Sequence, residues 1–124
     1  MNSTVLIVDD LAFMRTAIRD ILEKNGISVI AEAENGRDGV RALAAYKPDI
    51  VILDITMPVM DGLTALEYMR RVRPNSKVIM CSSIGQQQAV IRAIQLGAKD
   101  FVVKPFTPGR LLSAIRRAIG SNSG

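Results

Sequence analysis

The feature that most constrains the fold is a short apolar run, rich in β-branched residues, that recurs at near-constant intervals along the chain. The runs are Val5–Val8, Ile27–Ala31, Ile50–Leu53, Val78–Cys81 and Phe101–Val103. A longer segment follows each run, and its apolar residues recur with the period of a helix. Short strands that alternate with longer helices predict an α/β fold, in which a doubly wound parallel sheet is covered on both faces.

The first helical segment shows the pattern, because its apolar and polar residues fall on opposite sides. The apolar side holds Met14, Ile18, Ile21 and Leu22. The polar side holds Arg15, Arg19, Asp20 and Glu23. Asn25-Gly26 then has the form of a glycine cap that ends a helix.

The strand residues do not alternate between apolar and polar, as Ile50–Leu53 shows. A parallel strand that is buried on both faces has this composition. A mixed antiparallel sheet is the alternative, but the long segments between the runs favour parallel crossovers. Five such units account for one domain over residues 1–120 and leave a flexible tail over residues 121–124.

Composition excludes several kinds of chemistry, because the chain has no histidine and a single cysteine, Cys81. Histidine-ligated metal sites, structural zinc sites, histidine-assisted nucleophiles and an internal disulfide are all ruled out. Any catalytic or binding chemistry must therefore depend on carboxylates, hydroxyls, lysine or a hard cation. The early run Val5–Val8 is too short for a signal peptide or a membrane span, so we expect a cytoplasmic protein without membrane insertion.

Carboxylates follow two of the predicted strands directly. Asp9 and Asp10 follow the first strand, and Asp54 follows the third. Ligands of open α/β sheets bind at the carboxyl ends of strands where the strand order reverses, so these three acids converge if their strands are neighbours. An aspartate in such a place is often a helix cap, but a cap needs one acid, and Asp54 is too far from Gly62 to cap the next helix. Clustered carboxylates need a cation, and oxygen ligands are those that Mg²⁺ prefers.

A hydroxyl and an ammonium group follow two further strands, the fourth and the fifth, at the same edge. Ser82 follows the fourth run, and Lys104-Pro105 follows the fifth. Alone, each is more typical of a solvated turn. Beside acids and a cation, they would complete a pocket for an anion the size of a phosphoryl group.

In this order and spacing, the motifs resemble the receiver domain of two-component response regulators. The resemblance rests on Val8–Asp10, Leu53–Gly62, Cys81–Ser83 and Val103–Phe106, and it extends from Thr4 to Ile119. Within the family, further segments are similar to those of the stand-alone chemotaxis regulators. The similarity is to the regulators of bacteria in which the motor switch itself carries a phosphatase. These segments are Ala12–Arg15, Ala33–Gly36, Cys81–Gln87 and Gly97–Phe106. The resemblance implies a flavodoxin-like (βα)5 fold with strand order 2-1-3-4-5.

The resemblance also implies roles for the acids. Asp54 would accept a phosphoryl group from a phosphohistidine of a partner kinase. Asp10, Asp54 and the backbone carbonyl of Thr56 would ligate Mg²⁺ directly, and Asp9 would act through water. The transfer itself would depend on positioning and charge neutralisation.

Four further positions have implied roles. Lys104 would pair with a phosphoryl or carboxylate oxygen, aimed by a cis peptide bond before Pro105. Ser82 would hydrogen-bond the phosphoryl group once it is present. Phe101 stands where a tyrosine is often found, and phosphorylation would draw Ser82 inward and bury this ring.

Two residues flank the pocket and are expected to tune the loss of the phosphoryl group. They are Thr56 and Ile84, which in receivers lie where water reaches the acyl phosphate. A bulky Ile84 predicts hindered hydrolysis.

The resemblance implies protein partners for a monomeric signalling protein that is not an enzyme. A chemotaxis histidine kinase would be the phosphodonor, the flagellar motor switch would be the output partner, and a phosphatase is a third partner. A phosphorelay intermediate, or another stand-alone receiver, is the alternative within signalling.

Three other classes fit less well. A phosphatase of the haloacid dehalogenase type requires a second acid two residues after the nucleophile, but this position is Thr56 here. A flavin carrier would have its phosphate repelled by Asp9 and Asp10. Nucleic-acid binding is suggested by the net charge of +4, but no recognition motif accompanies the arginines near the helix ends. We instead expect protein docking near the last helix, with Lys99 and Arg110 at the rim.

Overall fold

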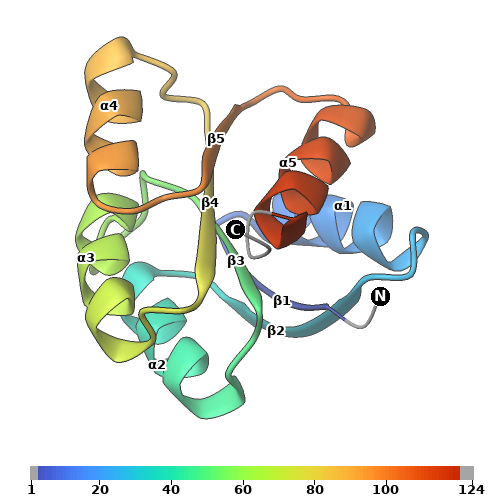
Figure 1. Cartoon of the computed structure of the whole chain (residues 1–124), viewed down its shortest axis with the longest axis horizontal. Coiled ribbons are helices and arrows are strands. Elements are labelled where there is room, and N and C mark those ends of the chain that lie inside the picture. Colours follow the sequence, from blue (N-terminus) through green and yellow to red (C-terminus); the bar gives the residue numbers. More distant parts are fainter. Residues whose placement is uncertain (1–2, 121–124) are drawn as a thin grey trace.

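The computed structural model describes residues 3–120, in which five parallel strands form one sheet (Figure 1). The strands are β1 (Thr4–Val8), β2 (Ser28–Ala33), β3 (Ile50–Leu53), β4 (Lys77–Ser82) and β5 (Asp100–Val103). The helices are α1 (Ala12–Glu23), α2 (Gly36–Tyr46), α3 (Gly62–Val72), α4 (Gln87–Gln95) and α5 (Pro108–Gly120). The strand order is β2-β1-β3-β4-β5, which confirms the predicted doubly wound sheet. The predicted tail, 121–124, lies outside the described residues.

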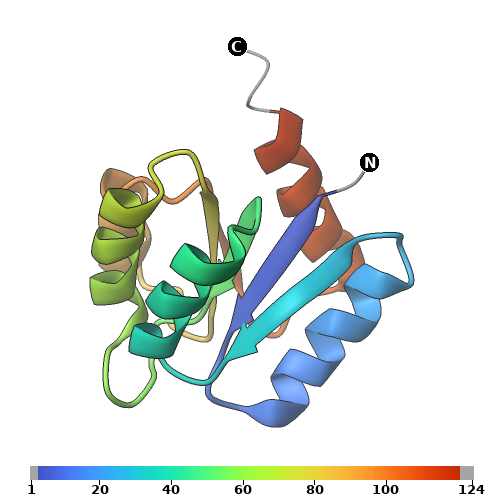
Figure 2. The same ribbon diagram turned by 90° about the horizontal axis from the view of Figure 1, so that it is seen from below.

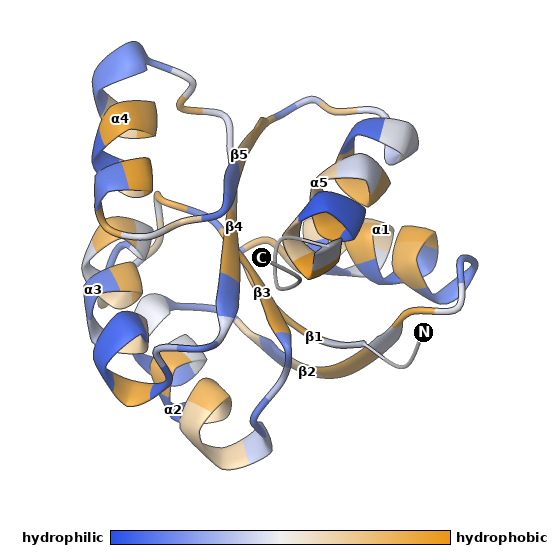
Figure 3. Ribbon diagram, in the orientation of Figure 1, coloured by the Kyte–Doolittle hydropathy of each residue, from blue (hydrophilic) through white to orange (hydrophobic). Residues whose placement is uncertain are grey.

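The helices form two layers around the sheet. Helices α1 and α5 cover one face, and α2, α3 and α4 cover the other (Figures 1 and 2). Successive residues of one strand enter different cores, so that Leu6 packs toward α2–α4 and Ile7 toward α1 and α5. Both faces are therefore apolar, as the colouring of the strands shows in Figure 3. This explains why β3 is a continuous apolar run.

Strand β2 differs from its predicted bounds, because it begins one residue later than Ile27–Ala31 and ends two residues later. The pairing with β1 shifts register, so that Ile30 is skipped and its side chain is 38% exposed. The longer strand brings the Ala33 carbonyl within 3.0 Å of the Asp9 amide. This hydrogen bond connects β2 to the segment after β1. The sequence pattern does not reveal the bulge that precedes it in β2.

The helix ends leave the strand-end acids free for other contacts. Gly26 has φ of +76° just after α1, as the predicted cap requires. Asn35 caps α2, and Asp61 caps α3 by accepting a hydrogen bond from the Thr64 amide at 2.9 Å. Helix α1 begins after Leu11 without a side-chain cap. Within residues 3–120, each helix is too short or too polar to span a bilayer.

Candidate functional site

Three carboxylates meet at the carboxyl edge of the sheet, because β1 and β3 are neighbours and end side by side. Asp9, Asp10 and Asp54 each place one carboxylate oxygen within 4.8 Å of the other two. Asp9 is 2% exposed and Asp54 is 7% exposed, whereas Asp10 faces solvent. One solvated and two buried acids at this spacing fit a cation that keeps part of its water shell, as Mg²⁺ does.

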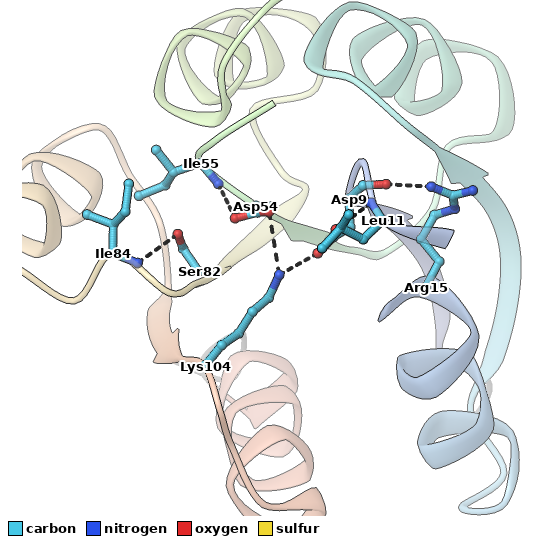
Figure 4. A network of polar contacts seen from close by, with 8 residues as sticks. All are labelled: Asp9, Leu11, Arg15, Asp54, Ile55, Ser82, Ile84 and Lys104. Atoms are coloured by element: carbon cyan, nitrogen blue, oxygen red, sulfur yellow. Dashed lines mark hydrogen bonds and ion pairs between the residues drawn. The ribbon is translucent and has the colours of Figure 1, made fainter. Parts of the chain in front are cut away.

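Lys104 enters this cluster from the end of β5 (Figure 4). Its ammonium nitrogen lies 2.6 Å from Asp9 Oδ2 and 3.4 Å from Asp54 Oδ2. Only 11% of the Lys104 side chain is exposed, so it is not a solvated loop lysine. The peptide bond between Lys104 and Pro105 is cis. The lysine therefore contacts both buried acids, and the closer contact is with Asp9.

Asp9 is held by contacts on all of its polar groups. Its amide donates to Ala33, and its Oδ1 accepts from the Leu11 amide at 3.0 Å. Its carbonyl accepts from Arg15 Nη1 at 2.6 Å, and its Oδ2 accepts from Lys104. Sequence reasoning missed Arg15, since the helical period places it on the polar side of α1. The side chain is in fact only 16% exposed.

The pKa values of Asp54 and Lys104 are both raised, but for different reasons. Burial, more than any other cause, raises the pKa of Asp54, and the negative charge of Asp9 adds to that effect. The charge of Lys104, the Ile55 amide at 2.7 Å from Oδ1 and a hydrogen bond with the Ser82 side chain lower it only in part. Burial lowers the pKa of Lys104, but its hydrogen bond with Asp9 and its attraction to Asp54 raise it on balance. The protonated Lys104 thus neutralises only part of the negative charge of the three acids. The cluster can therefore accept a further cation.

The loop after β3 is fixed by close backbone approaches. A Cβ on Gly62 would lie 1.9 Å from the Asp54 carbonyl oxygen, so only glycine fits there. The Gly62 amide donates to the Ile55 carbonyl at 2.7 Å, and the Gly36 amide donates to Met60 at 3.0 Å. Within residues 3–120, no hydrogen bond reaches the Thr56 carbonyl, which is therefore free to accept a cation.

Ser82, which is expected to switch, and Ile84 lie on the side of Asp54 away from Asp9 (Figure 4). Ser82 is fully buried, and its hydroxyl accepts a hydrogen bond from the Ile84 amide at 3.2 Å. Ile84 is half-buried against the apolar core. Phe101 is already buried, with 7% exposed. The predicted burial of Phe101 on phosphorylation therefore requires a second arrangement in which the ring is exposed.

Residues 5–116 match the family model described as the response regulator receiver domain. The chain belongs to this family. The receiver is also similar to the chemotaxis protein CheY of Bacillus subtilis, at 54% identity over 96% of this chain and 99% of the relative. The chemotaxis protein CheY of Thermotoga maritima is 51% identical over 94% of the chain and 98% of the relative. The site therefore lies in a receiver domain of the CheY-like chemotaxis type.

Solved structures agree with this assignment. A complex of CheX, CheY, BeF3 and Mg²⁺ from Borrelia burgdorferi contains a chain with a TM-score of 0.92 and 36% identity, covering 94% of this chain and 89% of that one. The response regulator domain of Thermotoga maritima CheB gives a TM-score of 0.91 at 33% identity, covering 97% and 98%. Both similarities extend over nearly the whole receiver.

Proposed function

We propose that this receiver accepts one phosphoryl group on Asp54, with Mg²⁺ as the cofactor, and acts as a signalling phosphoacceptor rather than as an enzyme that turns over a substrate. The observation that carries the proposal is the buried Asp54 carboxylate, which lies beside two further acids and one lysine ammonium. A carboxylate nucleophile, a lysine and a metal site are the parts that phosphoryl transfer needs.

The hydrogen bonds favour Asp54 over its neighbours as the nucleophile. Both carboxylate oxygens of Asp9 accept hydrogen bonds, at 3.0 Å from Leu11 and at 2.6 Å from Lys104. Asp10 lies in solvent, where water competes for the acyl phosphate. Asp54 Oδ1 accepts a hydrogen bond from the Ile55 amide at 2.7 Å, whereas the contact from Lys104 to Oδ2 is long, at 3.4 Å. Asp54 thus has one oxygen that the Ile55 amide orients and a second oxygen whose contact with Lys104 is long.

In the proposed transfer, an Asp54 oxygen attacks the phosphorus of a phosphohistidine on the kinase. The new P–O bond forms as the P–N bond breaks, and the leaving imidazole takes a proton. Mg²⁺ would be held by Asp10, Asp54 and the Thr56 carbonyl, with Asp9 acting through water, and it would neutralise phosphoryl charge. Lys104 would add a second positive charge, and the Ser82 hydroxyl would donate a hydrogen bond to the phosphoryl group.

The proposed partners are a chemotaxis histidine kinase as the donor and the flagellar motor switch as the output. Support comes from the relatives named chemotaxis protein CheY. The solved complex of CheX with a CheY, BeF3 and Mg²⁺ supports a protein partner for the loaded form. That such a partner is a phosphatase stays a prediction, as do the monomeric state and the cytoplasmic location.

The test is intact mass spectrometry after addition of a small phosphodonor, with and without Mg²⁺. We expect a gain of one phosphoryl mass that depends on Mg²⁺ and is lost in Asp54→Asn. No gain in the wild type would contradict the proposal, and steady hydrolysis of a phosphate ester would favour the phosphatase class. Capture of motor-switch protein by the beryllofluoride-loaded form would then support the proposed output, whereas transfer to a second histidine protein would indicate a phosphorelay.

A further inference from the structure

The β1–α1 segment carries two of the three clustered acids, and it lacks the side-chain cap that holds the starts of α2 and α3. Its position depends instead on contacts to Asp9. Among these contacts, the bond from Arg15 Nη1 to the Asp9 carbonyl is charge-assisted and short, at 2.6 Å. Figure 4 shows Arg15 reaching this carbonyl from α1, on the side of Asp9 away from Lys104.

Arg15 is itself held in place by an acid on β2. Its Nε donates to Glu32 Oε1 at 3.0 Å, and Arg19 binds the other oxygen, Oε2, at 2.7 Å. Glu32 thus receives one arginine on each oxygen. Because β2 also supplies the Ala33 carbonyl to the Asp9 amide, the metal-site segment is attached to β2 twice, once directly and once through Arg15.

The contact from Arg15 becomes more important if Lys104 leaves Asp9, as we expect when a phosphoryl group is on Asp54. The lysine now binds Asp9 Oδ2 at 2.6 Å, but a phosphoryl group on Asp54 would draw the ammonium toward its oxygens. Asp9 would then keep Arg15, Leu11 and Ala33 as its partners. Arg15 binds the backbone carbonyl and not the carboxylate, so it can hold the segment without occupying an oxygen that a cation needs.

We propose that Arg15 is a positioning residue that sets the affinity of the Asp9–Asp10–Asp54 cluster for Mg²⁺ by holding the Asp9 carbonyl. This inference rests on the proposed function, because it concerns the same metal site. Glu32 is the acid that orients Arg15 for this role.

The charge of Arg15 alone would change the Mg²⁺ affinity in the opposite direction from a positioning role. The direction of the change on removing Arg15 therefore tests the inference. Arg15 is a cation close to a cation site, so its removal should tighten Mg²⁺ binding if its charge were all that mattered. A positioning role predicts weaker binding, because the carboxylates would lose their preorganised spacing. Loss of a partner that orients metal ligands typically weakens metal affinity about 10-fold or more.

Arg19 offers a matched control on the same helix. It carries the same charge and shares Glu32 with Arg15, but it donates to the Val29 carbonyl and not to Asp9. The experiment measures the Mg²⁺ dissociation constant of wild type, Arg15→Gln, Arg15→Lys and Arg19→Gln by isothermal titration calorimetry. Hydrogen exchange of the Leu11 amide reports on the segment itself, and urea unfolding shows that each variant is folded.

We expect Arg15→Gln to weaken Mg²⁺ binding about 10-fold and to speed Leu11 exchange, with Arg19→Gln within about 2-fold of wild type. Arg15→Lys keeps the charge but cannot serve Glu32 and Asp9 together, so its dissociation constant should lie between those of wild type and Arg15→Gln. Equal effects of Arg15→Gln and Arg19→Gln, or tighter binding by Arg15→Gln, would overturn the positioning role while leaving the proposed function intact. Absence of Mg²⁺ binding by the wild type would overturn both.

Discussion

Asp54 follows β3 and Asp100 begins β5, and each has a cationic side chain close by, yet their surroundings shift their pKa values in opposite directions. Asp54 is 7% exposed, and burial raises its pKa above the ordinary value despite Lys104. The Asp100 side chain is 24% exposed, and burial raises its pKa less than the contacts with Arg110 and the Phe101 amide lower it. Both Asp100 oxygens lie within 3.2 Å of Arg110.

The difference lies in the number and geometry of the donors. Asp100 receives the two prongs of a guanidinium, which match its oxygens, and Arg110 also donates to the Phe101 carbonyl. Asp54 accepts from the Ile55 amide, but its cationic partner is an ammonium at 3.4 Å that lies closer to another acid. Asp100 is therefore a structural ion pair that joins β5 to α5. Asp54 is an undersatisfied acid, which opposes stability and suits chemistry with an incoming charge.

The backbone around the two acids is expected to show the largest contrast. Gly62→Ala places a Cβ against the Asp54 carbonyl, 1.9 Å away, so it should destabilise the fold by about 3 kcal/mol. Gly109→Ala, next to Arg110, meets nothing closer than 4.0 Å and should stabilise α5 by about 0.5 kcal/mol. Urea unfolding measures both. Equal effects would show that the loop after β3 adapts more freely than its contacts indicate.

The two cations should differ next in their effect on phosphorylation. Lys104→Met removes the ammonium that contacts Asp9 and Asp54, and we expect phosphorylation by a small phosphodonor to slow about 100-fold. Arg110→Met breaks the pair with Asp100 and the hydrogen bond to the Phe101 carbonyl, both away from the acid cluster, and its rate should stay within about 2-fold of wild type. Rates are read by intact mass at fixed Mg²⁺. A large loss in Arg110→Met would mean that the β5–α5 contact reaches the chemistry.

Neutralising each acid should change stability with opposite signs at neutral pH. Asp54→Asn removes a buried charge with an elevated pKa, and it should stabilise the protein by about 1 kcal/mol without Mg²⁺. Asp100→Asn removes a well-paired charge and should destabilise by about 0.5 kcal/mol. Thermal or urea unfolding at pH 7 decides this. Destabilisation by Asp54→Asn would show that Lys104 compensates the acid better than its distance suggests.

The pH dependence of these two variants should be the smallest effect. The pKa of Asp54 in the folded state lies above its ordinary value of 3.8, so protonated Asp54 contributes stability that is present below pH 3.8 and lost as the pH rises through the folded-state pKa. The pKa of Asp100 lies below 3.8, so its contribution is present above that pH and lost as the pH falls through the folded-state pKa. The advantage of Asp54→Asn should therefore appear as the pH rises, and the penalty of Asp100→Asn should vanish in acid. Unfolding at several pH values checks both signs.

The sequence predicted the sheet and the acid cluster because both depend on strand ends. Five apolar runs mark the strands, and Asp9, Asp10, Ser82 and Lys104 follow those runs directly. Once β1 and β3 are neighbours, parallel strands bring their ends together whatever the details of packing. The alternative of a mixed sheet is wrong because every strand pairing is parallel. Helix capping is wrong for the strand-end acids, since α1 begins without a side-chain cap and Asp61, not Asp54, caps α3.

The sequence could not predict the contacts that depend on register and rotamer. Arg15 meets Glu32 because β2 carries a bulge at Ile30, and the helical period alone placed that arginine in solvent. The closer contact of Lys104 with Asp9 than with Asp54 depends on side-chain geometry, as does the inward position of Phe101. The pair of Arg110 with Asp100 also depends on side-chain geometry, and the expected place of Arg110 at a docking rim stays a prediction.

The central claim is that burial and weak pairing make Asp54, and not its neighbours, the carboxylate that receives a phosphoryl group. The most direct measurement is to phosphorylate the protein with a small phosphodonor and Mg²⁺, reduce the acyl phosphate with borohydride, and locate the reduced residue by peptide mass spectrometry. We predict reduction at Asp54 alone. Reduction at Asp9 or Asp10, or none that depends on Mg²⁺, would contradict the account.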